Sequence, residues 1–158
     1  MSNKRTKFKQ GYYELVYPFK YIQPQDRTMN KQVLPQYRSS WELKFFKFCD
    51  SNPLILKWGV EPFPIQYWSP VDNKIRRYFV DGFIEFKSGD KFIIEIKPKA
   101  QTMPPKEPKR KTQKSMQKFN SDVETFLVNK AKWEAAKIFA DQNNLKFIIL
   151  TEIELGIK

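Results

Sequence analysis

The sequence predicts an α/β fold in which a central mixed sheet of about four strands is flanked by helices. Three patterns predict it: a helical period of apolar residues after Ser39, two apolar strands joined by a short turn over 76–97, and a closing strand at 146–151 that follows a helical segment. Strands on both sides of the helical segments are typical of a mixed α/β layer fold.

The length and composition favour one domain without a membrane span or a secretory signal. The chain has 158 residues, and no apolar run reaches the roughly 18 residues that a membrane helix needs. Its N-terminus is basic but is not followed by an apolar stretch. The single cysteine, Cys49, allows no internal disulfide, which fits a reducing compartment.

The chain contains no histidine, and this removes several kinds of chemistry. Ser-His-Asp sites, histidine general bases and histidine-bound zinc are excluded. The formal net charge of +12 favours a polyanionic partner such as nucleic acid, although a basic surface without a partner would look the same.

We expect two regions along the chain. Residues 1–34 are basic and rich in tyrosine and proline, which predicts an irregular N-terminal arm lying on the domain. Residues 35–158 are expected to form the folded domain. It begins with a helix capped by Ser39, for which Glu42 has the spacing of a capping box. Its apolar face is expected to comprise Trp41, Phe45, Phe48 and Cys49, and Asn52-Pro53 to end it.

Strands are expected at 60–68, 76–86 and 90–97, with a loop at 87–89. A proline- and lysine-rich loop should then lead to a helix starting at about Gln113. Asn129 could cap a separate last helix, whose packing face would be Trp133, Ala136 and Ala140.

The two apolar strands each carry an acid, Asp81 and Glu95. Because side chains alternate along a strand, Glu95 and Lys97 share one face. A three-residue turn with a left-handed Gly89 would place Asp81 opposite Glu95, whereas a one-residue slip would put the acids on opposite faces.

Two acids held together in an apolar sheet can both stay ionised only beside a cation. Mg²⁺, for which Mn²⁺ can substitute, suits two carboxylates, the main-chain carbonyl of Ile96 and waters. Lys97 could then orient a water for in-line attack on a DNA phosphate. The alternatives are a chance Glu-x-Lys spacing and a solvated Asp81 in a β-bulge. Glu42 is likewise open to two interpretations, a helix cap or a third acid of the site.

These residues resemble the PD-(D/E)xK nuclease superfamily. The matching segments are Y-R-S-S-W-E (37–42), W-G-V-E-P (58–62), R-R-Y-F-V-D (76–81) and F-I-I-E-I-K-P-K (92–99). Val80 replaces the usual proline before the aspartate. The chain is most similar to head-completion nucleases of T-even-like tailed phages and, more distantly, to TnsA-type endonucleases.

The resemblance implies a restriction-endonuclease-like core and a Mg²⁺-dependent DNA endonuclease activity that needs no nucleotide cofactor. It assigns Glu42, Asp81, Glu95 and Lys97 as catalytic residues. It also implies action on double-stranded DNA in the host cytoplasm during phage assembly, with portal or head proteins as partners and a place in the virion head or neck. Glu61 matches a recurrent family position, for which we expect a structural role.

Basic residues on both sides of the acid-bearing strands are candidates for contacts with DNA phosphates. They are Arg76, Arg77, Lys99, Lys109, Arg110 and Lys111. A solvated run of charge is the alternative for any single one of them. A competing function is a non-catalytic head or neck protein that binds DNA or the portal through its charge and its arm.

Overall fold

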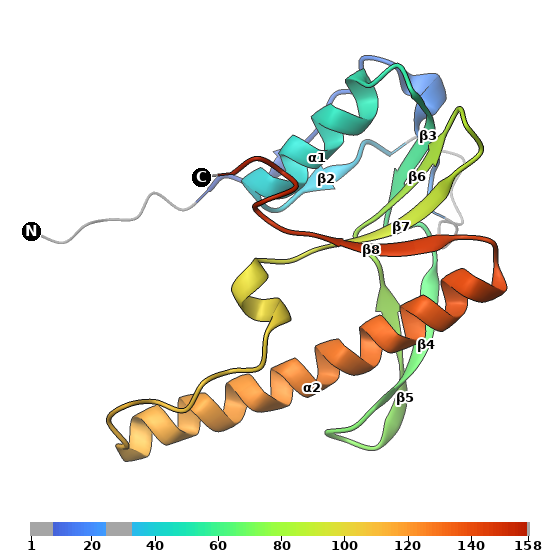
Figure 1. The fold of residues 1–158 in the computed structure, drawn as a ribbon. Coiled ribbons are helices and arrows are strands. Elements are labelled where there is room, and N and C mark those ends of the chain that lie inside the picture. Colours follow the sequence, from blue (N-terminus) through green and yellow to red (C-terminus); the bar gives the residue numbers. More distant parts are fainter. Residues whose placement is uncertain (1–7, 25–32, 158) are drawn as a thin grey trace, which may run out of the picture.

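The computed structural model describes residues 8–24 and 33–157, and Figure 1 shows its architecture. The central sheet has the order β3 (Ile55–Val60), β6 (Gly82–Phe86), β7 (Lys91–Ile96), β8 (Lys146–Leu150). β6 is antiparallel to both β3 and β7, whereas β8 runs parallel to β7. The predicted mixed sheet of about four strands is therefore confirmed.

A helix covers each face of this sheet. The alternation of β7 divides the core: Ile94 packs with α1 (Ser40–Ser51), whereas Ile93 packs with α2 (Gln113–Gln142). Both isoleucines are fully buried. The two apolar layers fix the position of β7, and with it the position of Glu95 at its end.

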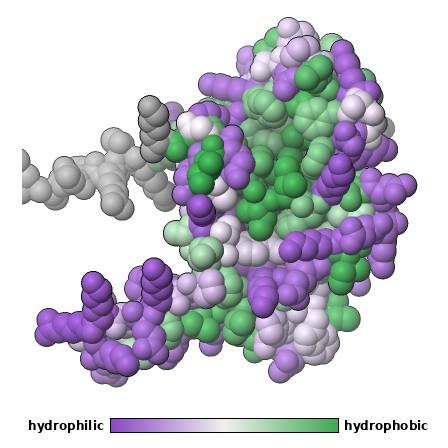
Figure 2. All heavy atoms as spheres, viewed as in Figure 1, coloured by the Kyte–Doolittle hydropathy of each residue, from purple (hydrophilic) through white to green (hydrophobic). Residues whose placement is uncertain are grey.

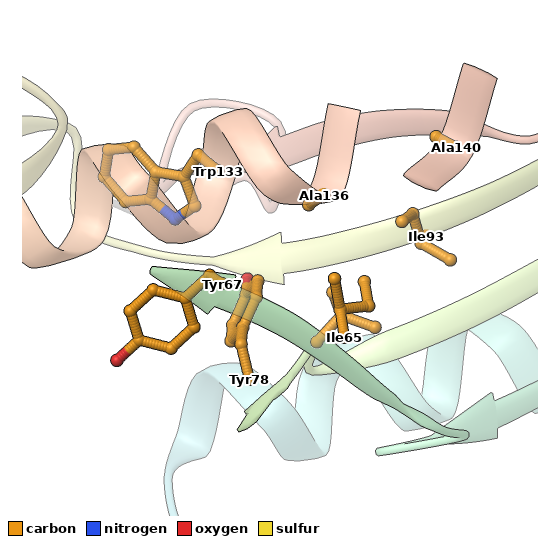
Figure 3. Packing of buried hydrophobic residues seen from close by; sticks show 8 residues of the cluster. Ile65, Tyr67, Tyr78, Ile93, Trp133, Ala136 and Ala140 are labelled. Carbon is orange, nitrogen blue, oxygen red and sulfur yellow. The ribbon is translucent and has the colours of Figure 1, made fainter. Parts of the chain in front are cut away.

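The strands at 60–68 and 76–86 differ from the prediction. The chain forms a separate hairpin of β4 (Pro64–Ser69) and β5 (Lys74–Phe79), and β3, which was not predicted, precedes it. The segment predicted as one strand over 76–86 is divided at Val80-Asp81, because β5 pairs with β4 whereas β6 pairs with β3. Tyr67, Tyr78 and Trp133 pack where the hairpin meets α2 (Figure 3).

Helix α1 begins and ends where the sequence predicts, but its buried face is rotated. Ser39 caps it by accepting a hydrogen bond from the Glu42 amide at 3.1 Å. Phe45, Phe46 and Cys49 are buried, whereas Phe48 is 49% exposed. The prediction for Phe48 was wrong because Phe46 packs against Tyr13 of the N-terminal segment, which turns that side of the helix inward.

Helix α2 is one continuous helix of 30 residues, so the predicted helix start at Asn129 is wrong. Asn129 is buried in its middle, and Thr112 forms the N-terminal cap with Ser115. The packing face of Trp133, Ala136 and Ala140 is confirmed. Figure 1 shows that the N-terminal half projects beyond the sheet, alongside the loop that follows η2 (Lys99–Thr102).

The described part of the N-terminal segment lies against the domain through short elements. β1 (Gly11–Tyr12) pairs with β2 (Gln36–Tyr37), and η1 (Pro18–Lys20) precedes Tyr21, whose ring contacts Trp58. The rest of residues 1–34, namely 1–7 and 25–32, lies outside the described residues. In the described ranges, no helix has the length and apolar character required to cross a membrane.

Candidate active site

The four predicted catalytic residues line one open cleft of about 460 Å³ between the start of α1 and the end of β7. Glu42 comes from α1, Asp81 from the junction of β5 and β6, and Glu95 and Lys97 from the end of β7. Ile96 also lines this cleft. Residues distant in the sequence are thus brought together by the helix and the sheet.

The turn between β6 and β7 sets the register on which the cleft depends. Gly89 has a φ of 95°, and the Phe86 amide donates to the Asp90 carbonyl at 2.9 Å. The predicted pairs of Glu85 with Lys91 and of Phe83 with Ile93 are confirmed. The ladder continues to Gly82 and Ile94, so Asp81 comes directly after its last pair, beside the end of β7.

Asp81 is held by the backbone of β7. Its Oδ2 atom accepts a hydrogen bond from the Ile96 amide at 2.7 Å. Burial, and then the negative charge of Glu95, raise the pKa of Asp81 to about 7, although the Ile96 amide and Lys97 act in the opposite direction. Ionisation of both carboxylates is therefore unfavourable unless a cation lies beside them.

Glu95 is buried, with 6% of its surface exposed, and two side chains contact its carboxylate. The Tyr78 hydroxyl donates to Oε2, and Lys97 Nζ lies 3.5 Å from Oε1. Burial and the Glu95 charge raise the pKa of Tyr78 well above its usual value, so its hydroxyl stays a donor. No role at the site was predicted for Tyr78 from the sequence. The available signal was that a buried acid such as Glu95 requires a hydrogen-bond donor. Because 76–86 was predicted as a single strand, nothing indicated that this donor is Tyr78.

Glu42 combines part of a helix cap with a position in the cleft. Its amide donates to Ser39, but its carboxylate accepts from the Arg38 amide at 2.5 Å rather than from Ser39, so the reciprocal capping box does not form. Glu42 and Asp81 line the same cleft, and the charge of Glu42 contributes to the raised pKa of Asp81. Both interpretations of Glu42 are therefore compatible with its position.

Glu61 lines a second pocket that shares Glu42, Asp81 and Ile96 with this cleft. Its amide donates to the Asp81 carbonyl at 3.3 Å, and its carboxylate pairs with Arg38 at 3.3 Å. Its backbone has a φ of 42°, in the left-handed region. These contacts connect the end of β3 to the backbone of Asp81.

The donor atoms fit a hard cation with few protein ligands. Over the described ranges, no group of three or more acidic or cysteine side chains is arranged to enclose a metal ion. Asp81, Glu95 and the Ile96 carbonyl would supply three oxygens, and water would complete the shell. Mg²⁺ commonly keeps several waters in this way.

The predicted DNA-contacting residues do not line the cleft; they lie on β5, on η2 and in the loop before α2. Arg76 and Arg77 are on β5, where Arg76 pairs with Asp72 and the Arg77 guanidinium lies 5.6 Å from the Phe79 ring. Lys99 opens η2, and its amide donates to Glu152. Lys109, Arg110 and Lys111 are exposed in the loop before α2. The part of the molecule that contains this loop is hydrophilic in Figure 2.

A mixed four-stranded sheet with a helix on each face, and with acids and a lysine at a strand end, defines a restriction-endonuclease-like fold class. Residues 52–152 match the family model described as the TnsA-like endonuclease N-terminal domain. The chain therefore belongs to this endonuclease family. The match contains Asp81, Glu95 and Lys97 but begins after Glu42.

The chain is also 44% identical over 116 residues to the head completion nuclease of Enterobacteria phage T4. The alignment covers 73% of this chain and 77% of that protein. The predicted family resemblance is therefore confirmed by both comparisons.

Proposed function

We propose that this protein is a Mg²⁺-dependent DNA endonuclease of a tailed phage, which hydrolyses phosphodiester bonds during completion of the DNA-filled head. The observation that carries the proposal is the convergence of Asp81, Glu95 and Lys97 in one cleft with concentrated negative charge. The family match and the name of the T4 relative support it. In this proposal residues 35–158 are a PD-(D/E)xK-type nuclease domain and 1–34 are an arm.

Each side chain of the cleft has a different role in the proposed hydrolysis. Asp81 and Glu95, with the Ile96 carbonyl, would hold Mg²⁺ or Mn²⁺. The bound cation would lower the pKa of water and offset charge on the phosphate. Lys97, whose Nζ is held 3.5 Å from Glu95, orients the water and stabilises negative charge on the phosphoryl oxygens. Glu42 adds a carboxylate on the helix side of the cleft.

The reaction needs only water as its second substrate. The water oxygen forms a bond to phosphorus while the bond to the leaving sugar oxygen breaks. One proton of the attacking water passes to solvent or to a cleft carboxylate, and the leaving oxygen takes one proton from solvent. The products are one phosphate monoester end and one hydroxyl end.

The basic residues beside the cleft would bind the duplex through its phosphates. Arg76 and Arg77 on β5, and the cations that follow β7, are suited to contact without base reading; the latter are Lys99, Lys109, Arg110 and Lys111. We place the activity in the host cytoplasm during assembly and in the virion head or neck, where portal or head proteins are the proposed partners.

Plasmid nicking with Mg²⁺ tests the catalytic assignment. We expect wild-type protein to nick, and Asp81→Asn, Glu95→Gln and Lys97→Met each to lose at least about 100-fold in rate, because Asp81 and Glu95 would hold the cation and Lys97 would act on the reacting phosphate. Asp90→Asn is the matched control, since Asp90 is an exposed acid in the same hairpin. Glu42→Gln then separates a catalytic role from helix capping.

Equal nicking by the wild type and the three cleft variants would contradict the assignment. A phage carrying Asp81→Ala and Glu95→Ala that still yields infectious particles would favour the non-catalytic head or neck protein instead.

A further inference from the structure

Asp81 and Glu95 are each oriented by a hydrogen bond from inside the protein. Each carboxylate has one oxygen engaged by a donor inside the protein: Asp81 Oδ2 by the Ile96 amide, and Glu95 Oε2 by the Tyr78 hydroxyl. The donor to Asp81 is a backbone amide, whose position is fixed by strand β7. The donor to Glu95 is a side chain from β5, a strand of the second sheet.

Tyr78 is built into its position. It is 5% exposed and belongs to the apolar cluster that joins the β4–β5 hairpin to α2. Lys132 Nζ of α2 lies 5.6 Å from the centre of its ring. With the ring held on these sides, the hydroxyl has little freedom, and the direction of the Glu95 carboxylate is restricted with it. Oε1 remains on the side of Lys97.

We propose that Tyr78 is a positioning residue that holds Glu95 in the orientation needed to bind the divalent cation. The inference rests on the proposed function, since it assumes that Glu95 is a ligand. Hydrogen-bond partners of metal ligands fix the ligand direction, and their loss commonly weakens metal affinity about 10- to 100-fold. The β4–β5 hairpin thereby acts on the site from outside the central sheet.

Calorimetric titration of the metal-free protein with Mn²⁺ tests this role without relying on cleavage. Tyr78→Phe keeps the ring and removes one oxygen. We expect its Mn²⁺ dissociation constant to rise about 10- to 100-fold, while duplex binding without a divalent cation stays the same.

Tyr67→Phe is the matched control. Tyr67 is buried in the same cluster, and Lys132 Nζ lies 5.7 Å from its ring, but Tyr67 is not the donor to Glu95. We expect its Mn²⁺ affinity to equal that of the wild type. In a Glu95→Ala background, the effect of Tyr78→Phe on Mn²⁺ affinity should disappear, and this distinguishes positioning from a general loss of packing.

Two outcomes would overturn the inference: unchanged Mn²⁺ affinity in Tyr78→Phe, or an equal loss in Tyr67→Phe. If Glu95→Ala weakens Mn²⁺ binding while Tyr78→Phe does not, only the role of Tyr78 fails. If Asp81→Asn and Glu95→Ala both bind Mn²⁺ like the wild type, the proposed metal site itself fails.

Discussion

The Asp81 carboxylate is fixed in position but is costly to ionise in the metal-free protein. Its side chain is held by the Ile96 amide, while Glu95 and Glu42 bring further negative charge to it. Lys97 offsets only part of this charge, so the pKa of Asp81 remains raised to about 7. An ionised Asp81 is therefore unfavourable in the metal-free protein, and a bound cation would remove that cost.

The raised pKa predicts a pH dependence of stability without metal. The folded state holds a proton on Asp81 up to about pH 7, whereas the unfolded chain releases it near its ordinary pKa of 3.8. The stabilisation is complete below pH 4 and is lost as the pH rises to about 7. In urea unfolding with a chelator present, the free energy of unfolding of Asp81→Asn should therefore exceed that of the wild type by up to about 4 kcal/mol at pH 8. Near pH 4 the two free energies should be equal.

Added Mg²⁺ gives the second half of this test. At pH 8 and about 100 times its dissociation constant, Mg²⁺ should stabilise the wild type by about 2.7 kcal/mol and Asp81→Asn by much less. Asp90→Asn should follow the wild type in both conditions. A difference between Asp81→Asn and the wild type that does not vary with pH would contradict the raised pKa.

At the scale of elements, local signals were predictable and pairings between elements were not. Helix α1 begins after Ser39 and ends before Asn52, as predicted, and the predicted turn at Gly89 gave the correct register of β6 with β7. The break at Asp81 was missed because the turn over 70–73, where Asn73 has a φ of 51° and which lets β5 pair with β4, was not recognised in the sequence. Tyr78 was missed for the same reason, since its contact with Glu95 spans two sheets.

The helices show the same limit in another way. Asn129 has the residue type of a cap, but it is buried within α2, where tertiary packing overrides its local preference. Of the candidate site, Glu95 and Lys97 followed from strand alternation alone. The position of Asp81 required the turn, and Glu42 was assigned by the family resemblance, because its local pattern alone favoured a cap.

The attachment of the N-terminal segment to α1 depends on one buried acid. Asp50 is 1% exposed, and its carboxylate accepts hydrogen bonds from the Tyr13 hydroxyl and from the amides of Val16 and Tyr17 at 2.8–3.1 Å. Lys20 Nζ donates to the Asp50 carbonyl at 2.8 Å. These contacts fix a segment of little regular structure on the outside of the domain.

Asp50→Ala should destabilise the fold by about 3 kcal/mol or more, because it leaves two amides and a hydroxyl without their acceptor. Tyr13→Phe, which removes one of these bonds, should cost about 1.5 kcal/mol. Urea unfolding followed by tryptophan fluorescence is suited to both, since Trp58 packs against Tyr13. Equal effects of the two substitutions would contradict the shared role assigned to the Asp50 carboxylate.

At the scale of the whole molecule, charge and shape act together. The chain leaves β7 at the cleft, passes through η2 and runs out along the projecting half of α2 (Figure 1). This projection is hydrophilic in Figure 2, and in the sequence over 106–118 cationic residues predominate. Its ion pairs are exposed, such as Lys111 with Glu107 at 3.4 Å. Exposed pairs of this kind contribute little, so these cations remain available to phosphates. The projection thus extends a basic surface outward from the proposed catalytic residues.

Replacing Lys109, Arg110 and Lys111 together by alanine should weaken duplex binding and lower its salt dependence. Each phosphate contact contributes about 0.9 to the slope of log affinity against log salt, so the slope should fall by about 2.7. The measurement is fluorescence anisotropy without a divalent cation, over about 50–200 mM salt. The matched control replaces Lys87, Lys91 and Lys146, which are exposed at the opposite end of the sheet, where β7 and β8 begin. The slope of this control should remain that of the wild type, because a duplex lying across the cleft would not reach that end. An equal fall in the slope of both triple variants would show that charge alone, and not the projection, determines where DNA binds.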